Sequence, residues 1–227
     1  MKLTLVNKKD EVAGVVTFVF QPAEKLEWQA GQFLHYVLHH EPTDSRGSDR
    51  WFTVSSAPFE NQVQITTRLA DEKGSTFKAA LKNLAVGETI EISDIDGDFV
   101  VEDQNQEYIF IAGGIGITPF HSILKQRAHD NLPIKVILMY ANRDENIVFK
   151  DELEEIAVKN PNLKINYFIG PNRIDEEAIR TLASDLQKPI FYVSGPEPMV
   201  DALGKTLKEI GVPEQHLKQD WFPGYLA

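Results

Sequence analysis

The chain has 227 residues, a net charge of −11 at neutral pH and no cysteine. Without cysteine there can be no disulfides, thiolate-ligated iron–sulfur clusters or cysteine nucleophiles, so redox chemistry would need a dissociable cofactor or a partner protein. The negative charge disfavours nucleic acid and anionic membranes as partners. No apolar run approaches the roughly 20 residues that span a bilayer, and the N-terminus lacks a signal-peptide pattern. We therefore expect a cytoplasmic protein without membrane insertion.

The first hundred residues have the pattern of a β-rich fold. Short runs of β-branched and aromatic residues alternate with turn residues, which is typical of a barrel or sandwich. These runs lie at residues 12–20, 32–38, 51–55, 63–69 and 89–92. One helix is predicted among them, at residues 76–84.

After the polar stretch EDQNQ at residues 102–106, strands alternate with helices. The predicted strands lie at residues 108–112, 134–140, 164–169 and 189–193, and the predicted helices at 119–129, 150–158, 175–186 and 198–210. This alternation indicates βαβ units around a parallel sheet. We therefore predict a β + α/β protein: an antiparallel β-barrel domain at residues 1–103 and a Rossmann-like α/β domain at residues 104–227. Open parallel sheets bind ligands at the carboxyl ends of their strands.

A glycine-rich turn connects the first of these parallel strands to its helix. Gly113, Gly114 and Gly116 allow close approach of a ligand to the backbone, and the helix N-terminus attracts phosphate. Thr118 can cap the helix, and Pro119 suits its first turn. The spacing differs from G-x-G-x-x-G. The position between a strand and a helix nevertheless favours phosphate binding over an empty tight turn.

Two later segments are ambiguous on their own. Ser194-Gly195-Pro196-Glu197-Pro198-Met199 follows another predicted strand, where it could flank the same ligand or form an ordinary turn. The chain ends in DWFPGYLA, with Trp221, Phe222 and Tyr225 close together. These aromatic residues either pin the terminus to the core or cover a flat ligand.

The most informative segment of the first half is RWFTVS at residues 50–55. The Arg50 guanidinium can bind a pyrophosphate with two hydrogen bonds, and Phe52 can stack on a planar ring. Thr53 and Ser55 can hydrogen-bond to a ring edge. A plain amphipathic strand with a surface arginine would show the same pattern.

With these motifs the chain resembles the ferredoxin–NADP⁺ reductase superfamily. The matching segments, in chain order, are Arg50-Trp51-Phe52-Thr53, Gly74-Ser75-Thr76, Leu84-Ala85-Val86-Gly87-Glu88, Gly97-Asp98-Phe99, Ala112 to Pro119 and Ser194 to Met199. They follow the family order over almost the whole chain. Serine at position 194 replaces the cysteine of many members, and no fused iron–sulfur domain is present in the sequence.

The resemblance implies roles for individual residues. Arg50, with Ser75 and Thr76, would hold the flavin phosphates, Phe52 would stack on the isoalloxazine, and Thr53 would lie near flavin N5. The predicted catalytic residues are Thr53, Ser194, Asp220 and Phe222. The predicted cofactor-binding residues are Arg50, Trp51, Phe52, Thr53, Val54, Ser55, Thr66, Thr67, Gly74, Ser75, Thr76, Gly113, Gly114, Gly116, Thr118, Pro119, Arg143, Arg173, Gly195, Pro196 and Met199.

The implied function is hydride transfer between NAD(P)H and bound FAD, with single electrons exchanged between the flavin and a carrier such as ferredoxin or flavodoxin. FAD is favoured over FMN. NADP is slightly favoured over NAD, because Arg143 and Arg173 each follow a predicted strand and could meet a 2′-phosphate. No acid–base pair is evident among the six histidines, and His39-His40 lacks metal-ligand spacing, so no metal is expected. A flavin-binding relay or regulatory subunit of a larger complex, and a nucleotide-binding module without flavin, remain alternatives.

Overall fold

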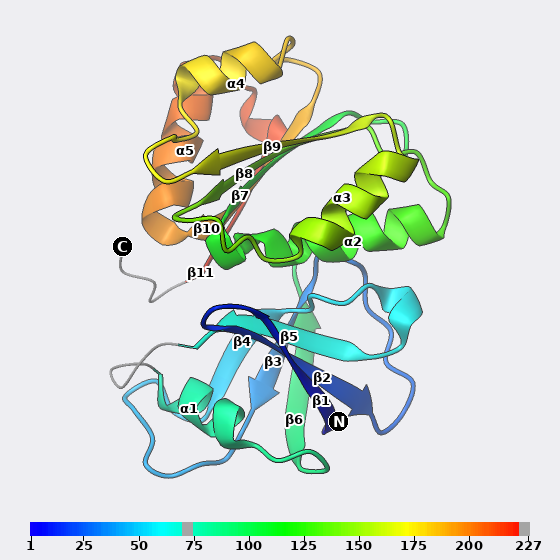
Figure 1. Cartoon of the computed structure of the whole chain (residues 1–227), viewed down its shortest axis with the longest axis vertical. Helices are drawn as coiled ribbons and strands as arrows, with labels where there is room; N and C mark the ends of the chain where they lie inside the picture. The colour runs from blue at the N-terminus through cyan, green and yellow to red at the C-terminus, as the bar shows by residue number, and fades with distance from the viewer. Residues whose placement is uncertain (70–74, 223–227) are drawn as a thin grey trace.

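The computed structural model describes residues 1–69 and 75–222, with the side chain of Phe222 excepted. Gly74 and Tyr225, named above, lie outside the described residues. The described chain forms two layers, an antiparallel sheet around the N-terminus and a parallel sheet with helices above it (Figure 1).

The antiparallel sheet has six strands in the order β4-β3-β6-β1-β2-β5. The strands are β1 (Lys2–Val12), β2 (Val15–Pro22), β3 (Phe33–Val37), β4 (Asp49–Thr53), β5 (Val63–Arg68) and β6 (Thr89–Asp96). The helix α1 (Thr76–Asn83) and the short 3₁₀ helix η1 (Pro58–Glu60) belong to this half. Alternate residues of its strands point inward and form one buried core that includes Phe18, Phe20 and Leu34. The predicted antiparallel barrel is confirmed.

One predicted strand of this half is in fact a turn followed by a strand. The run at residues 12–20 begins at the end of β1, turns at Gly14 with a φ of +74°, and continues as β2. β1 itself was not predicted. Its sequence is dominated by charged residues, and only Leu3 and Leu5 are buried. A strand with one solvent-exposed face and few apolar positions shows little alternation of apolar and polar residues in its sequence.

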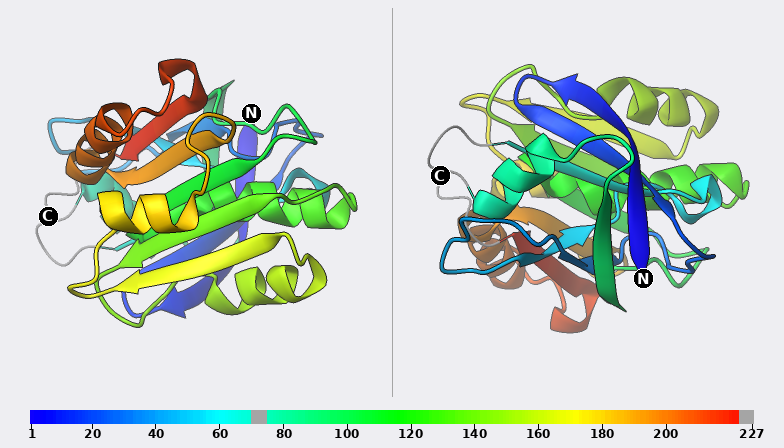
Figure 2. Two further views of the ribbon diagram at one scale, coloured as in Figure 1. Left: turned by 90° about the horizontal axis from the view of Figure 1, so that it is seen from above. Right: turned by 90° about the horizontal axis from the view of Figure 1, so that it is seen from below.

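The parallel sheet has five strands in the order β11-β10-β7-β8-β9. The strands are β7 (Tyr108–Gly113), β8 (Val136–Asn142), β9 (Leu163–Ile169), β10 (Ile190–Pro196) and β11 (Leu217–Phe222). The helices are α2 (Thr118–His129), α3 (Lys150–Lys159), α4 (Glu176–Leu182) and α5 (Glu197–Glu209), and short 3₁₀ helices lie at η2 (Gly114–Ile117) and η3 (Glu214–His216). Seen from above, helices cover both faces of the sheet (Figure 2).

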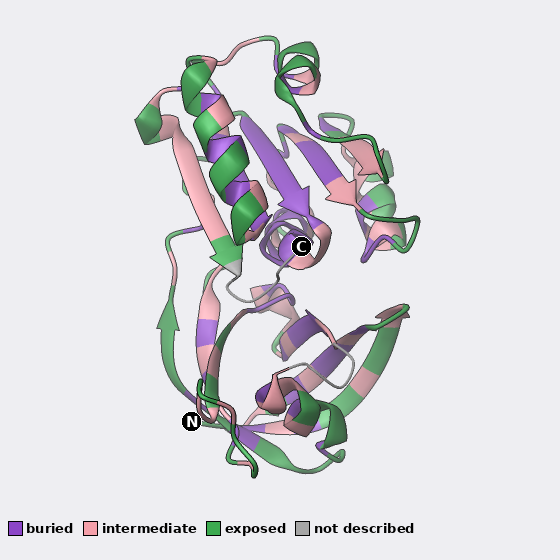
Figure 3. Cartoon of the chain, turned by 90° about the vertical axis from the view of Figure 1, so that its left-hand side faces the viewer, coloured by how far each residue is buried: buried purple, intermediate pink, exposed green. Residues whose placement is uncertain are grey.

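Strand β7 shows why both faces are covered. All six of its residues are buried, as the central strands of Figure 3 also show. Phe110 packs with α2 and α3 in one core, whereas Ile109 and Ile111 pack with α4 and α5 in another. Such continuous burial is typical of parallel strands. The predicted α/β architecture is confirmed, although α4 is shorter than the predicted helix at residues 175–186.

The segment between the two sheets is anchored to the parallel sheet. Tyr192 donates a hydrogen bond of 2.6 Å to the carbonyl of Val100, and the Phe99 ring packs 4.7 Å from the Tyr192 ring. Arg127 of α2 donates to the carbonyls of Gln104 and Pro133. Among the described residues, no helix is long and apolar enough to cross a membrane.

Candidate functional site

The parallel sheet gathers many of the predicted residues at one edge. Because its five strands run in the same direction, their carboxyl ends meet on one side. The turn at Gly113 follows β7, Arg143 follows β8 and Arg173 follows β9. Ser194 lies within β10, and Asp220 pairs with it from β11. The sheet therefore brings together segments that are about 100 residues apart in the sequence.

The glycine turn and the Ser194 turn touch each other directly. Gly114 has a φ of +52°, which favours glycine. A Cβ on Gly116 would overlap the carbonyl of Ser194, and a Cβ on Gly113 would overlap the side chain of Met199. Met199 thus fills the space between the two turns. The glycines are needed here for close packing as well as for any ligand.

Thr118 does not cap α2 as the sequence suggested. The N-cap residue is Ile117, and the Thr118 hydroxyl donates to the carbonyl of Ile115 at 3.2 Å. Pro119 lies in the first turn of the helix, as predicted. Thr118 already has helical backbone angles, φ −56° and ψ −46°, whereas a capping residue lies just outside the helix. Within the described chain this helix start has no side-chain cap; η2 runs directly into α2, and the Thr118 backbone N–H bonds to the carbonyl of Ile115.

Ser194 and Asp220 form a polar pair on neighbouring strands, with Ser194 buried and Asp220 half-buried. Ser194 is fully buried, and its Oγ lies 3.5 Å from Asp220 Oδ2. Burial raises the pKa of Asp220 to about 6, and the nearby carboxylate of Asp98 acts in the same direction, while the Ser194 hydroxyl opposes the shift. Asp220 can therefore gain or lose a proton close to neutral pH.

In the antiparallel sheet, Thr53 has a buried hydroxyl without a partner. The residue is 4% exposed, and its Oγ1 has no hydrogen-bond partner among the described residues. Leaving such a group unpaired costs roughly 1–3 kcal/mol. A hydroxyl in this position fits the edge of a hydrogen-bonding heterocycle such as the isoalloxazine, which offers ring nitrogens and carbonyls. The neighbouring residue Val54 belongs to the barrel core.

The two aromatic residues of β4 lie on opposite sides of the strand. Phe52 packs against the rings of Phe77 and Tyr36, at 5.7 and 6.0 Å. Trp51 is 45% exposed and stacks on His35 at 4.6 Å. Only Phe52 faces the α1 side of the strand, so the two residues cannot contact one flat ligand in the same way.

Arg50 is held by a carboxylate that sequence reasoning missed. Its Nη2 lies 3.0 Å from Asp44 Oδ1 and 3.3 Å from Ser75 Oγ. Asp44 also accepts from the Arg46 guanidinium at 2.7 Å and from the Thr76 backbone N–H at 3.2 Å. The hydrogen bond from Arg46 is the main reason why the pKa of Asp44 lies well below its usual range. A carboxylate therefore engages the donors that the resemblance assigns to the flavin phosphates.

The remaining barrel hydroxyls bond to one another. Ser55 Oγ lies 2.8 Å from Thr66 Oγ1, which in turn lies 2.7 Å from Thr17 Oγ1. Ser55 also donates to the carbonyl of Gln64 at 3.1 Å. Thr67 is buried beside them. Their assignment to the cofactor stays a prediction.

Helix α2 connects the glycine turn to the segment that follows β4. Helix α2 extends directly from the turn, and Ser122 on this helix donates to the carbonyl of Ser56 at 2.6 Å. His121 on the same helix lies 2.8 Å from the carbonyl of Ser55. The η2 turn also lies against β5. These contacts fix the position of Thr53 and the strand β4 relative to the start of α2.

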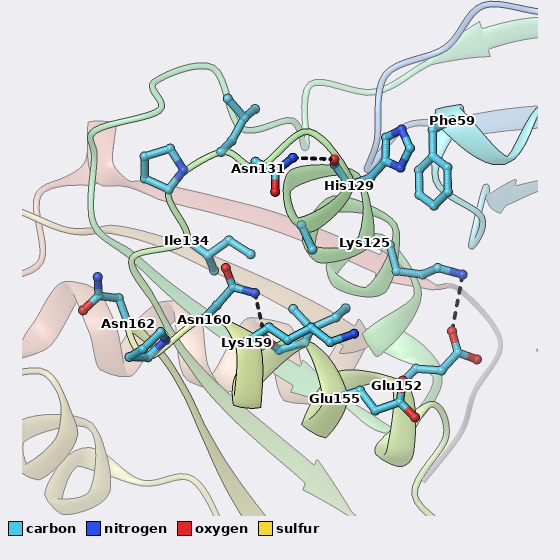
Figure 4. A pocket seen from close by; sticks show the side chains of 15 residues that line it. Phe59, Lys125, His129, Asn131, Ile134, Glu152, Glu155, Lys159, Asn160 and Asn162 are labelled. Atoms are coloured by element: carbon cyan, nitrogen blue, oxygen red, sulfur yellow. Dashed lines mark hydrogen bonds and ion pairs between the residues drawn. The ribbon is translucent and has the colours of Figure 1, made fainter.

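A hollow of about 640 Å³ lies elsewhere, between the C-terminal halves of α2 and α3 (Figure 4). Ile134 precedes β8, and Asn160 and Asn162 precede β9, so the hollow lies toward the amino ends of these strands. None of the residues predicted for cofactor binding lines it. The hollow is therefore separate from the candidate site.

Comparisons with known proteins agree with this geometry. Residues 110–205 match the family described as "Oxidoreductase NAD-binding domain". The chain is 29% identical over 233 residues to the ferredoxin reductase component of 3-ketosteroid-9-alpha-monooxygenase from Rhodococcus rhodochrous. The match covers 97% of this chain and 64% of that protein. Overall, the chain spans about three fifths of the length of the curated relatives that it matches.

Solved structures show the same fold. The FAD/NAD binding domain of nitric oxide dioxygenase from Vibrio cholerae is similar with a TM-score of 0.83 and 22% identity, covering 97% of this chain and 98% of that one. Ferredoxin-NADP⁺ reductase from Plasmodium falciparum is similar with a TM-score of 0.81 and 17% identity, covering 97% and 95%.

The fold and the paired turns define an oxidoreductase module in which a nucleotide-binding parallel sheet adjoins an antiparallel barrel. Within that class, residues 110–205 form an oxidoreductase NAD-binding domain, and the whole chain is similar in sequence and fold to flavin-dependent NAD(P)H oxidoreductases of the ferredoxin–NADP⁺ reductase superfamily. The predicted resemblance is confirmed, and the predicted cofactors, FAD with NAD or NADP, agree with it.

Proposed function

We propose that the chain is an NAD(P)H-dependent flavoprotein reductase that passes hydride between NAD(P)H and FAD and single electrons between the flavin and an external carrier such as ferredoxin or flavodoxin. Residues 1–103 would hold the flavin and residues 104–227 the nicotinamide dinucleotide. The observation that supports this most strongly is the buried, unpartnered Thr53 hydroxyl, close to a helix that starts from the glycine turn.

On the flavin side, Thr53 would bond to the ring edge, and Arg50, Ser75 and Thr76 would share their donors between Asp44 and the flavin phosphates. When bound, the flavin supplies the conversion between two-electron and one-electron steps. The protein contributes alignment and the exclusion of water.

On the nucleotide side, the backbone of Gly113, Gly114 and Gly116 would approach the dinucleotide phosphates, with Gly195 and Pro196 near the nicotinamide. Asp220, with a pKa of about 6, would hold or release a proton beside Ser194. A serine at this position can donate a hydrogen bond but offers no thiol. Asp220 and Ser194 therefore act here through hydrogen bonding and charge.

We infer NADP as the nucleotide. Arg143 and Arg173 are both exposed and lie beyond the carboxyl ends of the neighbouring strands β8 and β9. Neither forms an ion pair with another described residue. Two free guanidinium groups at this edge suit a 2′-phosphate. In Arg143→Ala and Arg173→Ala, we expect a loss of affinity for NADPH and little change for NADH.

The test begins with the visible spectrum of the purified chain and its titration with FAD and FMN. Anaerobic stopped-flow reduction with NADH and with NADPH follows, and then turnover with ferricyanide and with ferredoxin or flavodoxin. We expect FAD binding, rapid reduction and carrier-dependent turnover. Bound flavin without NAD(P)H turnover would instead support a relay or regulatory subunit. A chain that binds neither FAD nor FMN would overturn both.

A further inference from the structure

Helix α2 is bonded to the barrel along its whole length. The contacts reach the segment that follows β4, from Ser55 to Glu60. They are His121 with the Ser55 carbonyl, Ser122 with the Ser56 carbonyl, Gln126 with the Phe59 N–H at 2.9 Å, Lys125 with Glu60 at 2.8 Å, and the His129 ring on the Phe59 ring at 3.9 Å. Figure 4 shows three of these side chains, Lys125, His129 and Phe59. One helix therefore connects the glycine turn to the predicted flavin strand.

His121 differs from the other α2 residues that contact the barrel, because both of its ring nitrogens face hydrogen-bond acceptors. The residue is 1% exposed, and its ring stacks on Phe149 at 3.7 Å. Nδ1 lies 2.8 Å from the Ser55 carbonyl, and Nε2 lies 3.1 Å from Glu152 Oε2. A neutral imidazole has only one N–H, whereas the imidazolium has two. Both contacts are hydrogen bonds only if His121 is protonated.

Charged side chains surround the His121 ring. The His121 contact, together with Lys125 and Lys9, keeps the pKa of Glu152 well below its usual range, so Glu152 is a carboxylate. Lys125 lies 3.3 Å and Lys9 3.5 Å from this carboxylate.

Each lysine has a second acid as a partner. Lys9 pairs with Glu11 on β1 at 2.9 Å, and Lys125 pairs with Glu60 on η1 at 2.8 Å. Together with Glu152 on α3 and the ring on α2, the cluster contains three carboxylates and three basic side chains. The charges balance when His121 carries a proton.

We propose that His121, as an imidazolium, is a positioning residue that holds β4 and the segment after it against the glycine turn at Gly113 for hydride transfer, an inference that rests on the proposed function. His121 is the fourth residue of α2, so its Cα lies about 6 Å along the helix from the turn. Ser55 lies two residues, roughly 7 Å, beyond Thr53. Hydride transfer needs reacting atoms about 3–3.5 Å apart, and an error of 1 Å can cost about 100-fold in rate.

The proposal predicts a pH dependence with a defined sign. Loss of the His121 proton removes one of the two donors and leaves the cluster with a net negative charge. The Ser55 carbonyl or the Glu152 carboxylate then lacks its partner. We expect flavin reduction at saturating nucleotide to be fast where His121 is protonated and to slow through one ionisation as the pH rises.

The main experiment measures anaerobic flavin reduction by stopped flow over a range of pH, with the FAD-loaded full chain. His121→Phe keeps a ring on Phe149 and removes both donors. We expect its rate to fall about 10- to 100-fold, with a flat pH profile and dissociation constants for FAD and nucleotide within twofold of the wild type. His129→Phe, on the same helix, is the matched control and should keep both rate and profile.

A second variant separates the effect of the positive charge on His121 from the effect of its two hydrogen bonds. In Glu152→Gln, a neutral His121 can donate from Nδ1 to Ser55 and accept at Nε2 from the Gln side-chain amide. We expect this variant to retain most of the rate while losing the pH dependence. Because it changes no ring packing, it also serves if His121→Phe does not fold.

A measurement that needs no enzyme turnover tests this inference separately from the proposed function. Nitrogen-15 NMR of labelled histidine, in the chain without added cofactor, should show both His121 nitrogens protonated at neutral pH. A neutral tautomer there, or a wild-type rate and profile in His121→Phe, would overturn the inference. Doubly protonated His121 in a protein that NAD(P)H does not reduce would instead count against the proposed function.

Discussion

The two halves of the candidate site differ in how firmly their parts are held. At the carboxyl edge of the parallel sheet, the turns at Gly116 and Ser194 touch, and no space remains for a side chain between them. Beside β4, Arg50 Nη2 pairs with the Asp44 carboxylate. The first region is fixed by backbone packing, and the second by a side-chain ion pair. Substitutions should therefore abolish function in the first region and tune it in the second.

The largest effect is expected from Gly116→Val. The new side chain would overlap the Ser194 backbone. This backbone belongs to β10, which pairs with a strand on each side, so moving it would cost stability. We expect nucleotide-dependent flavin reduction to fall by more than about 100-fold, since a misplacement of 1 Å already costs that much. The measurement is stopped-flow reduction, with FAD affinity as the internal control. Unchanged NADPH affinity would show that the two turns are less firmly packed than the structure indicates.

Arg50→Ala should weaken FAD binding by about 30- to 100-fold, because hydrogen bonds to charged groups contribute roughly 1.5–3 kcal/mol each. Fluorescence quenching during FAD titration measures the change. Arg46→Gln is a suitable control, since this exposed arginine contacts Asp44 but was not assigned to the flavin. Equal losses in the two variants would move the phosphate contact away from Arg50.

Asp220 gives a prediction for stability. Its folded-state pKa of about 6 exceeds the unfolded value of roughly 3.9, so the folded state binds the proton more tightly. The free energy of unfolding should then fall as the pH rises from about 4 to 6, by about 1–2 kcal/mol. Asp220→Asn should remove this decrease. Urea denaturation across the pH range measures it, and parallel curves for both proteins would contradict the buried carboxylate.

The smallest effect is expected from Asp44→Asn. A flavin phosphate must share the Arg50 and Thr76 donors with the Asp44 carboxylate, and removing its charge leaves these donors to the ligand. We expect FAD affinity to rise about five- to tenfold, equivalent to about 1 kcal/mol. Asp49→Asn, an exposed acid on the same strand as Arg50, is the control. Weaker FAD binding in Asp44→Asn would mean that Asp44 orients Arg50.

The sequence predicted the elements whose pattern is strong and local. Apolar runs such as β7 and β8, and the strand–turn–helix at Gly113, came directly from periodicity and turn chemistry. β1 and β11 were missed because charged and amide side chains such as Lys218 and Gln219 interrupt their alternation. The cap assigned to Thr118 was wrong because the helical backbone begins earlier, at η2, and places Thr118 inside the helix, which the residue types alone do not reveal.

Contacts over long sequence distances could not be read from the sequence. Asp44 meets Thr76 across 32 residues, and His121 meets Ser55 across 66. The six histidines looked equivalent in composition, and burial alone separates His121 from the exposed His129. The assignment of individual residues to flavin and nucleotide stays a prediction, which the substitutions above test.

The ion pair between Asp44 and Arg50 bears on how the protein matures in a cell. Because the chain brings its own counter-ion to this arginine, the barrel reaches an electrically balanced fold with no help from small molecules. A guanidinium group is therefore not left without a charged partner before any cofactor binds.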